Sequence, residues 1–96
     1  MSQSALPKLS LYHRNFCWFC SSVLHEIKAL DMESEVEGRN IWQDAEALQE
    51  LEQATGRTTV PVLRIENTDG KVTWMPESSD IVQSLHSLNG PADATA

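Results

Sequence analysis

Short runs of the chain alternate apolar and polar residues, and longer stretches repeat apolar residues every three to four positions, so the pattern predicts strands and helices in turn. Residues 8–13 predict a short first strand. Residues 32–37 alternate apolar and mostly acidic positions, which predicts a strand at a sheet edge, ended by Gly38. Between them a helix is predicted over about residues 17–30. Its apolar face consists of Cys20, Val23, Leu24, Ile27 and Leu30.

A second helix is predicted after this strand. Asn40 and Gln43 have the spacing of an N-terminal capping box, so the helix is expected to begin at Asn40. Gly56 is typical of the residue that follows a helix and is expected to end it. The apolar face of this helix consists of Ile41, Ala45, Leu48 and Leu51.

The last third of the chain predicts a hairpin followed by a helix. Residues 59–65 read as a strand with a proline near its beginning, where a missing N–H does least harm. A turn signal over residues 67–70 and a return strand over residues 71–75 complete the hairpin. Residues 76–79 then offer capping side chains for a third helix, which residues 89–91 stop.

The predicted order is therefore β-α-β-α-β-β-α, an α/β fold in which three amphipathic helices cover a four-stranded mixed sheet. A strand–helix–strand unit places its two strands in parallel. No internal repeat or linker divides the chain, so residues 1–96 are predicted to form one domain. Its core is expected over about residues 8–88, with a loose arm over 1–7 and a tail over 90–96.

Composition narrows the possible functions. The net charge of −7, without a cluster of Lys or Arg, argues against nucleic acid as a partner. No apolar run reaches the length of a membrane span. The first five residues lack the basic and apolar regions of a signal peptide, so we expect a cytoplasmic protein. In a reducing compartment, two closely spaced cysteines are more often redox-active than structural.

The only two cysteines, Cys17 and Cys20, carry the candidate chemistry. Their Cys-x-x-Cys spacing puts them one helical turn apart on one side, where a disulfide can form with little backbone movement. A thiol on the first turn lies among unpaired N–H groups at the positive end of the helix dipole, which favours the thiolate. Cys17 is therefore a candidate nucleophile and Cys20 its candidate resolving partner.

Two other interpretations remain open for the cysteine pair. A zinc site would need two further ligands, and only His13, His25 and His86 offer ring nitrogens, at unrelated positions. An inert pair in the core fits Cys20, which follows the helical pattern, better than Cys17, which follows a polar loop.

The three tryptophans are expected to have different surroundings. Trp18 stands between the two cysteines and is predicted to be exposed, as a platform for substrate or as a cover for the loop. Trp42 and Trp74 are predicted to be packing residues, because each lies at the start of an element or within an apolar run.

Taken together, three motifs resemble those of the glutaredoxin family: Cys17-x-x-Cys20 after the first strand, Thr59-Val60-Pro61 at the start of the third, and Ser78-Ser79-Asp80 at the last helix. The resemblance covers about residues 8–88. It implies a thioredoxin-like, three-layer α/β/α fold. It also implies a monomeric thiol–disulfide oxidoreductase that reduces protein–glutathione mixed disulfides or protein disulfides, with glutathione as electron donor and no metal.

The resemblance also implies where glutathione binds. Arg14 would meet a carboxylate of glutathione, and the backbone of Val60, before a cis Pro61, would pair with its cysteinyl part. Residues 78–80 would hold the γ-glutamyl end, where helix-start N–H groups favour a carboxylate. The implied glutathione site consists of Arg14, Phe19, Thr59, Val60, Pro61, Ser78, Ser79 and Asp80.

The chain also departs from the family pattern. Trp18-Phe19 stand where dithiol members usually carry Pro-Tyr, and Met75-Pro76 replace the usual Gly-Gly. Glu77-Ser78, with Ile81, is similar to a motif in the N-terminal domain of glutathione transferases, which also binds the γ-glutamyl group. Two alternative functions stay open, namely a carrier of a glutathione-ligated iron–sulfur cluster and a thioredoxin-like reductase that does not use glutathione.

Overall fold

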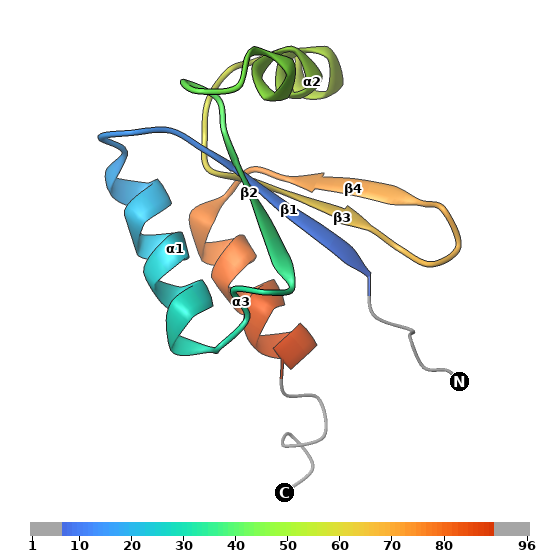
Figure 1. Cartoon of the computed structure of the whole chain (residues 1–96). Coiled ribbons are helices and arrows are strands. Elements are labelled where there is room, and N and C mark those ends of the chain that lie inside the picture. Colours follow the sequence, from blue (N-terminus) through green and yellow to red (C-terminus); the bar gives the residue numbers. More distant parts are fainter. Residues whose placement is uncertain (1–6, 90–96) are drawn as a thin grey trace, which may run out of the picture.

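The computed structural model describes residues 7–89, which form four strands and three helices (Figure 1). Their order is the one predicted from the sequence. The elements are β1 (Lys8–His13), α1 (Trp18–Ala29), β2 (Val36–Asn40), α2 (Ala45–Thr55), β3 (Val62–Glu66), β4 (Val72–Met75) and α3 (Ser78–Asn89). The arm predicted over residues 1–7, except for Pro7, and the tail predicted over 90–96 lie outside the described residues.

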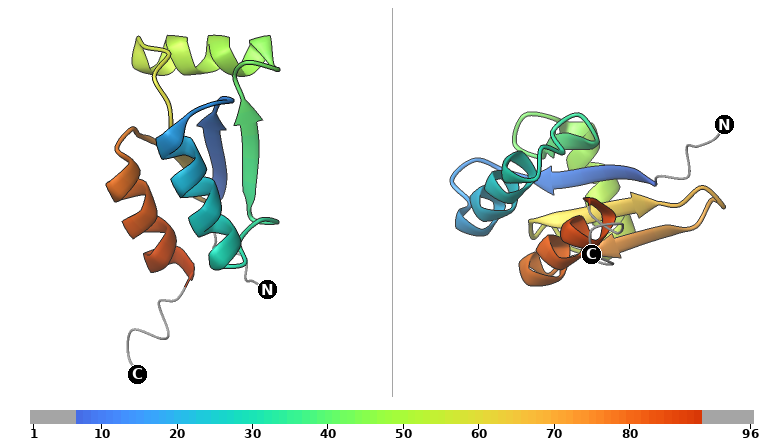
Figure 2. Two further views of the ribbon diagram at one scale, coloured as in Figure 1. Left: turned by 90° about the vertical axis from the view of Figure 1, so that its left-hand side faces the viewer. Right: turned by 90° about the horizontal axis from the view of Figure 1, so that it is seen from below.

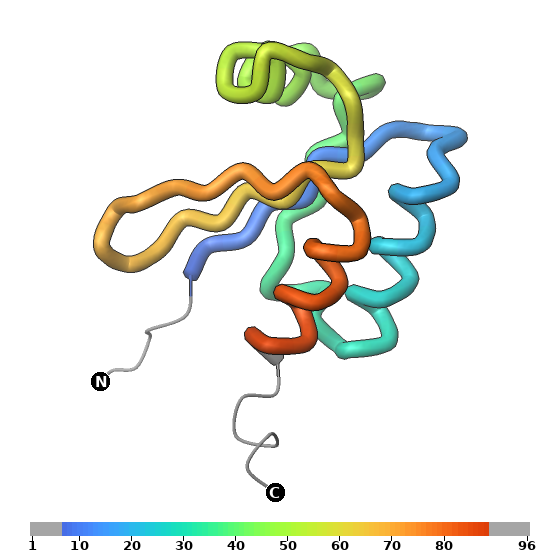
Figure 3. The backbone as a smooth tube through the Cα atoms, turned by 180° about the vertical axis from the view of Figure 1, so that it is seen from behind, coloured from blue at the N-terminus to red at the C-terminus, as the bar shows by residue number. Residues whose placement is uncertain are grey.

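The four strands form one mixed sheet in the order β2-β1-β3-β4. Strand β1 pairs in parallel with β2, as expected for two strands connected by a helix, and antiparallel with β3. Strands β3 and β4 form an antiparallel hairpin that extends away from α1 (Figure 3). The edge position predicted for the charged second strand is therefore confirmed.

The helices cover the two faces of the sheet unequally. Helices α1 and α3 lie side by side on one face, and α2 crosses the other face near one end of the sheet (Figure 2). The predicted three-layer α/β/α arrangement is confirmed. The larger buried cluster lies under α1 and α3 and consists of Leu9, Leu11, Val23, Ile27, Met32, Val36, Leu63, Ile81 and Leu85. Among the described residues, no helix combines the length and the apolar character needed to cross a membrane.

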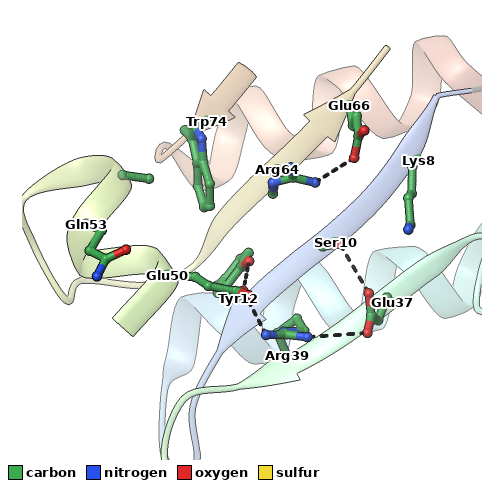
Figure 4. Close-up of a pocket in the computed structure, with 11 residues that line it drawn as sticks. Lys8, Ser10, Tyr12, Glu37, Arg39, Glu50, Gln53, Arg64, Glu66 and Trp74 are labelled. Atoms are coloured by element: carbon green, nitrogen blue, oxygen red, sulfur yellow. Dashed lines mark hydrogen bonds and ion pairs between the residues drawn. The ribbon is translucent and has the colours of Figure 1, made fainter. Parts of the chain in front are cut away.

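Helix α2 is attached to the sheet by a smaller apolar cluster and by polar contacts beside it. The phenol of Tyr12 donates to Glu50 at 2.8 Å, and Arg39 forms an ion pair with the same carboxylate at 2.7 Å (Figure 4). Burial, helped by the bond to Glu50, raises the pKa of Tyr12 to about 12. An open cavity of about 520 Å³ adjoins these contacts and is lined by Arg39 and Arg64. Arg64 forms an ion pair with Glu66 at 3.0 Å. The apolar cluster itself consists of Tyr12, Ile41, Ala47, Leu51 and Val62.

The predicted bounds of the second strand are wrong. Strand β2 begins only at Val36, because the carbonyl of Met32 accepts from the backbone N–H groups of Glu35 and Val36 and closes a turn there. Gly38 does not end the strand but lies inside it, opposite Leu11. A Cβ at Gly38 would lie 3.2 Å from Nε2 of His13, so a glycine at this position lets the imidazole approach the strand.

The predicted start of the second helix is also wrong. The Asn40 side chain accepts from the N–H of Trp42 at 2.9 Å and forms a local turn instead of a helix cap. The N-cap is Asp44, whose carboxylate accepts from the N–H groups of Glu46 and Ala47 at 3.0 and 3.3 Å. The predicted stop is confirmed, since Gly56 caps the end with φ 74°.

Candidate active site

Strand β1 leads directly into the cysteine loop, and Cys17 ends this loop as the N-cap of α1. Its backbone is extended, with φ −119° and ψ 112°, so the side chain turns back over the first helical turn. The Sγ of Cys17 accepts from the backbone N–H of Cys20 at 3.3 Å. The sulfur thus occupies the position that a Ser or Asp oxygen takes in an ordinary cap, and it faces N–H groups without helical partners.

The two thiols are both free and both buried, to different extents. Cys17 is 7% exposed and Cys20 only 1%. Burial, and then the hydrogen bond with Cys17, raises the pKa of the Cys20 thiol to about 12. Cys20 is therefore protonated at neutral pH, and Cys17 is the sulfur that a substrate can reach more easily.

A second loop meets Cys17 from the side of β3. The peptide bond between Val60 and Pro61 is cis, as the family resemblance implies. The carbonyl oxygen of Val60 lies 3.8 Å from the Sγ of Cys17 and accepts from the thiol. Pro61 is buried, whereas Val60 is half-buried and Thr59 is exposed. The structure therefore brings the Thr59–Pro61 segment to the candidate nucleophile.

The start of α3 lies at the same end of the molecule as the start of α1 (Figure 2). Ser78 is half-buried, and Ser79 and Asp80 are exposed on the first turn. The N–H of Ile81 already bonds the carbonyl of Glu77, so only the earlier N–H groups of this turn lack a helical partner. Residues 78–80 thus offer hydroxyls and backbone donors on the same side as the cysteine loop.

Arg14 and Phe19 differ in how freely they can meet a ligand. The guanidinium of Arg14 donates to the carbonyls of Asn15 and Phe16 at 3.0 and 3.2 Å, within its own loop. It also lies over the ring of Trp42, 5.3 Å from the centroid. The ring of Phe19 is 60% exposed on the first turn of α1.

Sequence reasoning missed an aromatic pair beside the cysteines. Phe16 is 90% exposed and has φ 56°, a left-handed conformation that bulky residues rarely adopt. Its ring lies 6.0 Å from that of Trp42. Trp42, predicted to be a packing residue, therefore packs at the surface and not in the core, since it is 56% exposed. Trp18, predicted to be exposed, is 82% exposed. The available signal was composition, because four of the six aromatic residues lie in or beside this loop.

The histidines do not gather around the cysteines. His86 lies 2.7 Å from a carboxylate oxygen of Glu26, on the facing helices α1 and α3. His13 ends β1, and burial lowers its pKa below the usual value. Within residues 7–89, no group of three or more His, Cys, Asp or Glu side chains is placed to hold a metal ion.

Comparison with known families identifies one sequence match. The sequence model of the glutaredoxin family matches residues 9–69, nearly two thirds of the chain. The match includes both cysteines and the cis-proline loop and ends before α3. No curated protein matches the chain at a comparable level.

Solved structures share the thioredoxin-like fold. A trimeric glutathione transferase from Leishmania has 30% identity and a TM-score of 0.67, covering 90% of this chain and 19% of its own. A maleylacetoacetate isomerase from Anaeromyxobacter dehalogenans, with dicarboxyethyl glutathione in its active site, has 22% identity, a TM-score of 0.64 and coverages of 92% and 40%. The present chain therefore spans less than half of either protein.

A glutaredoxin from Brucella melitensis matches over nearly its full length. It has 15% identity and a TM-score of 0.56, and the match covers 97% of this chain and 91% of its own. At this identity the likeness concerns the fold alone. It agrees with the arrangement of one mixed sheet between helices described above.

Proposed function

Because this chain belongs to the glutaredoxin family, we propose that it is a glutathione-dependent oxidoreductase that reduces protein–glutathione mixed disulfides. The observation that carries the proposal is the position of Cys17. Its Sγ caps α1, accepts from the N–H of Cys20 at 3.3 Å and lies 3.8 Å from the carbonyl of Val60. A backbone N–H donor stabilises the thiolate of a nucleophilic cysteine, and an extended segment such as the one at Val60 can pair with a peptide-like ligand.

The proposed reaction begins when the Cys17 thiolate attacks the glutathione sulfur of the mixed disulfide. A new disulfide joins Cys17 to glutathione, and the substrate protein leaves as a thiolate that takes up a proton. A second glutathione thiolate then attacks the adduct, so that glutathione disulfide is released and the Cys17 thiolate returns. The Cys20 N–H contributes a hydrogen bond that strengthens as negative charge develops on the departing Cys17 sulfur.

Cys20 has a secondary role in this scheme. A dithiol route would need the Cys20 thiolate to attack the adduct and form the Cys17–Cys20 disulfide. Burial raises the pKa of the Cys20 thiol and disfavours that thiolate, so the proposal assigns the second step to external glutathione.

The proposed glutathione site combines the three segments around Cys17. The backbone at exposed Thr59 and half-buried Val60 would pair with the cysteinyl part, and the start of α3 would bind the γ-glutamyl carboxylate. Arg14 would need to release at least one loop carbonyl to contact the other carboxylate. The identity of 30% with a glutathione transferase supports glutathione as the ligand. The complete proposed set is Arg14, Phe19, Thr59, Val60, Pro61, Ser78, Ser79 and Asp80.

A turnover assay with a glutathionylated peptide, glutathione and glutathione reductase tests the proposal. We expect steady turnover by the wild type, none by Cys17→Ser and at least about half of the wild-type rate by Cys20→Ser, since glutathione resolves the adduct. Equal loss in both variants would contradict the assigned roles. Turnover supported by a flavoenzyme-coupled dithiol system but not by glutathione would replace the proposal with a thioredoxin-like reductase.

A further inference from the structure

The strand order places two different loops on opposite sides of the cysteine loop. Strand β1, which leads to Cys17, lies between β2 and β3. The loop that precedes β3 carries Val60, and the loop that follows β2 carries Trp42. In the left view of Figure 2 the cysteine loop lies between these two connections. The Thr59–Pro61 part of the proposed glutathione site is on the β3 side, and Arg14 lies over Trp42 on the β2 side. The surface of the β2 side beyond Arg14 is left for the other half of a mixed disulfide.

The β2 side of the loop presents two exposed aromatic rings, inclined to each other by 59°. We call the pair Phe16 and Trp42, with rings 6.0 Å apart, the aromatic ledge. Within residues 7–89, Phe16 and Trp42 belong to the large hydrophobic side chains that are exposed, at 90% and 56%. Trp18 and Phe19, on the first turn of α1, are exposed as well. The rings of Phe16 and Trp42 at these exposures present on the order of 300 Å² of apolar surface. A patch of this size on a small protein commonly marks an interaction site.

The ledge is held in place by contacts between the two loops. The side-chain amide of Asn40 donates to that of Asn15 at 2.9 Å, and the N–H of Ile41 donates to the carbonyl of His13 at 2.8 Å. The Arg14 guanidinium lies over the Trp42 ring and donates to the carbonyl of Phe16. The surface is therefore preorganised, which reduces the entropy lost when a partner binds.

Charge indicates what kind of partner suits the ledge. The chain carries a net charge of −7, and no Asp or Glu occurs from residue 12 to residue 25, on the Phe16 side of the ledge. On the Trp42 side, the carboxylate of Asp44 accepts from two backbone N–H groups of α2. The guanidinium of Arg14, over the Trp42 ring, donates to carbonyls of its own loop. The charges beside the ledge are thus engaged within the protein, and its aromatic contacts favour an apolar side chain.

We propose that the aromatic ledge binds the protein half of the mixed disulfide and selects cysteines flanked by aliphatic or aromatic side chains. This inference rests on the proposed function. When the Cys17 sulfur bonds to the glutathione sulfur, the bond that breaks releases the substrate thiolate toward the β2 side. An apolar neighbour of the substrate cysteine then lies against Phe16 and Trp42, which act as specificity-determining residues.

The experiment compares two glutathionylated peptides in single turnover with Cys20→Ser protein, by the rate at which each peptide thiol is released. In one peptide Leu and Phe flank the cysteine, and in the other two serines flank it. We expect the apolar peptide to react about tenfold faster, the discrimination typical of one apolar contact. In the same background, Phe16→Ala and Trp42→Ala should each lower this ratio toward one. Val72→Ala, which truncates an exposed side chain on β4, should keep it.

Using the ratio of two peptides separates recognition from any change in the reactivity of Cys17, because both peptides meet the same sulfur. A ratio near one in the parent, or an unchanged ratio in both ledge variants, would overturn the inference. So would a concentration-dependent dimer that Trp42→Ala abolishes, since a second copy would then cover the ledge.

Failure of the proposed function would look different. Peptides capped with 2-mercaptoethanol provide the comparison, because this cap lacks every group that the glutathione site recognises. If glutathione is not recognised, both caps react at equal rates while the preference for the apolar peptide persists. If only the ledge proposal fails, the glutathione cap reacts faster and the two peptides do not differ.

Discussion

The hydroxyl of Tyr12 on β1 donates to the carboxylate of Glu50 on α2 at 2.8 Å, across the junction that holds this helix on the sheet. Replacing Tyr12 with Phe keeps the ring and removes only this bond. We expect Tyr12→Phe to lower the free energy of unfolding by about 1 kcal/mol, because Glu50 keeps Arg39 as a partner. Urea unfolding should show a lower midpoint with an unchanged slope. If Tyr12→Phe lowers stability equally in a Glu50→Ala background, which lacks the acceptor, the bond is not the cause.

Stability should fall in alkaline solution because of two buried acids. The pKa of the Cys20 thiol is raised from 9.0 to about 12, and that of the Tyr12 phenol from 10.0 to about 12. Below pH 9 both groups are protonated in the folded and unfolded states, and their contribution is complete. As pH rises from 9 to 12, these two groups ionise in the unfolded chain but stay protonated in the folded protein, so the free energy of unfolding decreases. Urea midpoints measured across this window should decrease, and the combined variant Cys20→Ser and Tyr12→Phe should flatten the decrease.

The two cysteines should differ in their reaction with an alkylating reagent. At neutral pH we expect iodoacetamide to modify Cys17 at least about tenfold faster than Cys20, whose thiol is buried and protonated. Mass spectrometry of peptides from quenched samples measures both rates. Unfolding in concentrated urea should make the two rates similar. A native Cys20 that reacts as fast as Cys17 would contradict the assignment of the attacking sulfur.

The stability of helix α2 should depend on its N-cap, Asp44, which the sequence pattern did not indicate. Asp44→Ala removes the acceptor of two backbone N–H groups and should cost about 1 kcal/mol of stability. Asp44→Asn should keep most of it, because asparagine caps helices about as well as aspartate. Thermal unfolding followed by circular dichroism compares both variants with the wild type. Equal stability of Asp44→Ala and the wild type would show that the cap is dispensable.

The order of elements could be predicted from the sequence because each element carries its own period. The predicted bounds of elements were wrong where a short motif is compatible with two local structures. Asn40 has the residue type of a helix cap, yet its side chain accepts from Trp42 and closes a turn. The alternation that begins at Met32 looks like a strand, yet its first residues form a turn around the Met32 carbonyl. Which local structure forms depends on tertiary contacts that a local pattern does not contain.

The candidate site likewise has a part that could be predicted from the sequence and a part that could not. Cys17 and Cys20 belong to one compact motif, so their proximity was predictable, whereas a cis Pro61 beside them was implied only by the resemblance to the glutaredoxin family. The pairing of Phe16 with Trp42 was not predictable, because these residues are far apart in sequence and meet only once β2 lies beside β1. The extent of burial of Cys17 likewise depends on the approach of the Val60 loop.

Because β1 lies inside the sheet, the structure that leads to Cys17 should stay intact when other parts of the fold open locally. Its backbone bonds β2 on one edge and β3 on the other, so it cannot fray from the sheet as an outer strand such as β4 can. Amide hydrogens of Leu9 and Leu11 should therefore exchange with solvent only when the whole domain opens. Cys17, the proposed nucleophile, follows this inner strand, so local opening of an outer strand should leave its position unchanged.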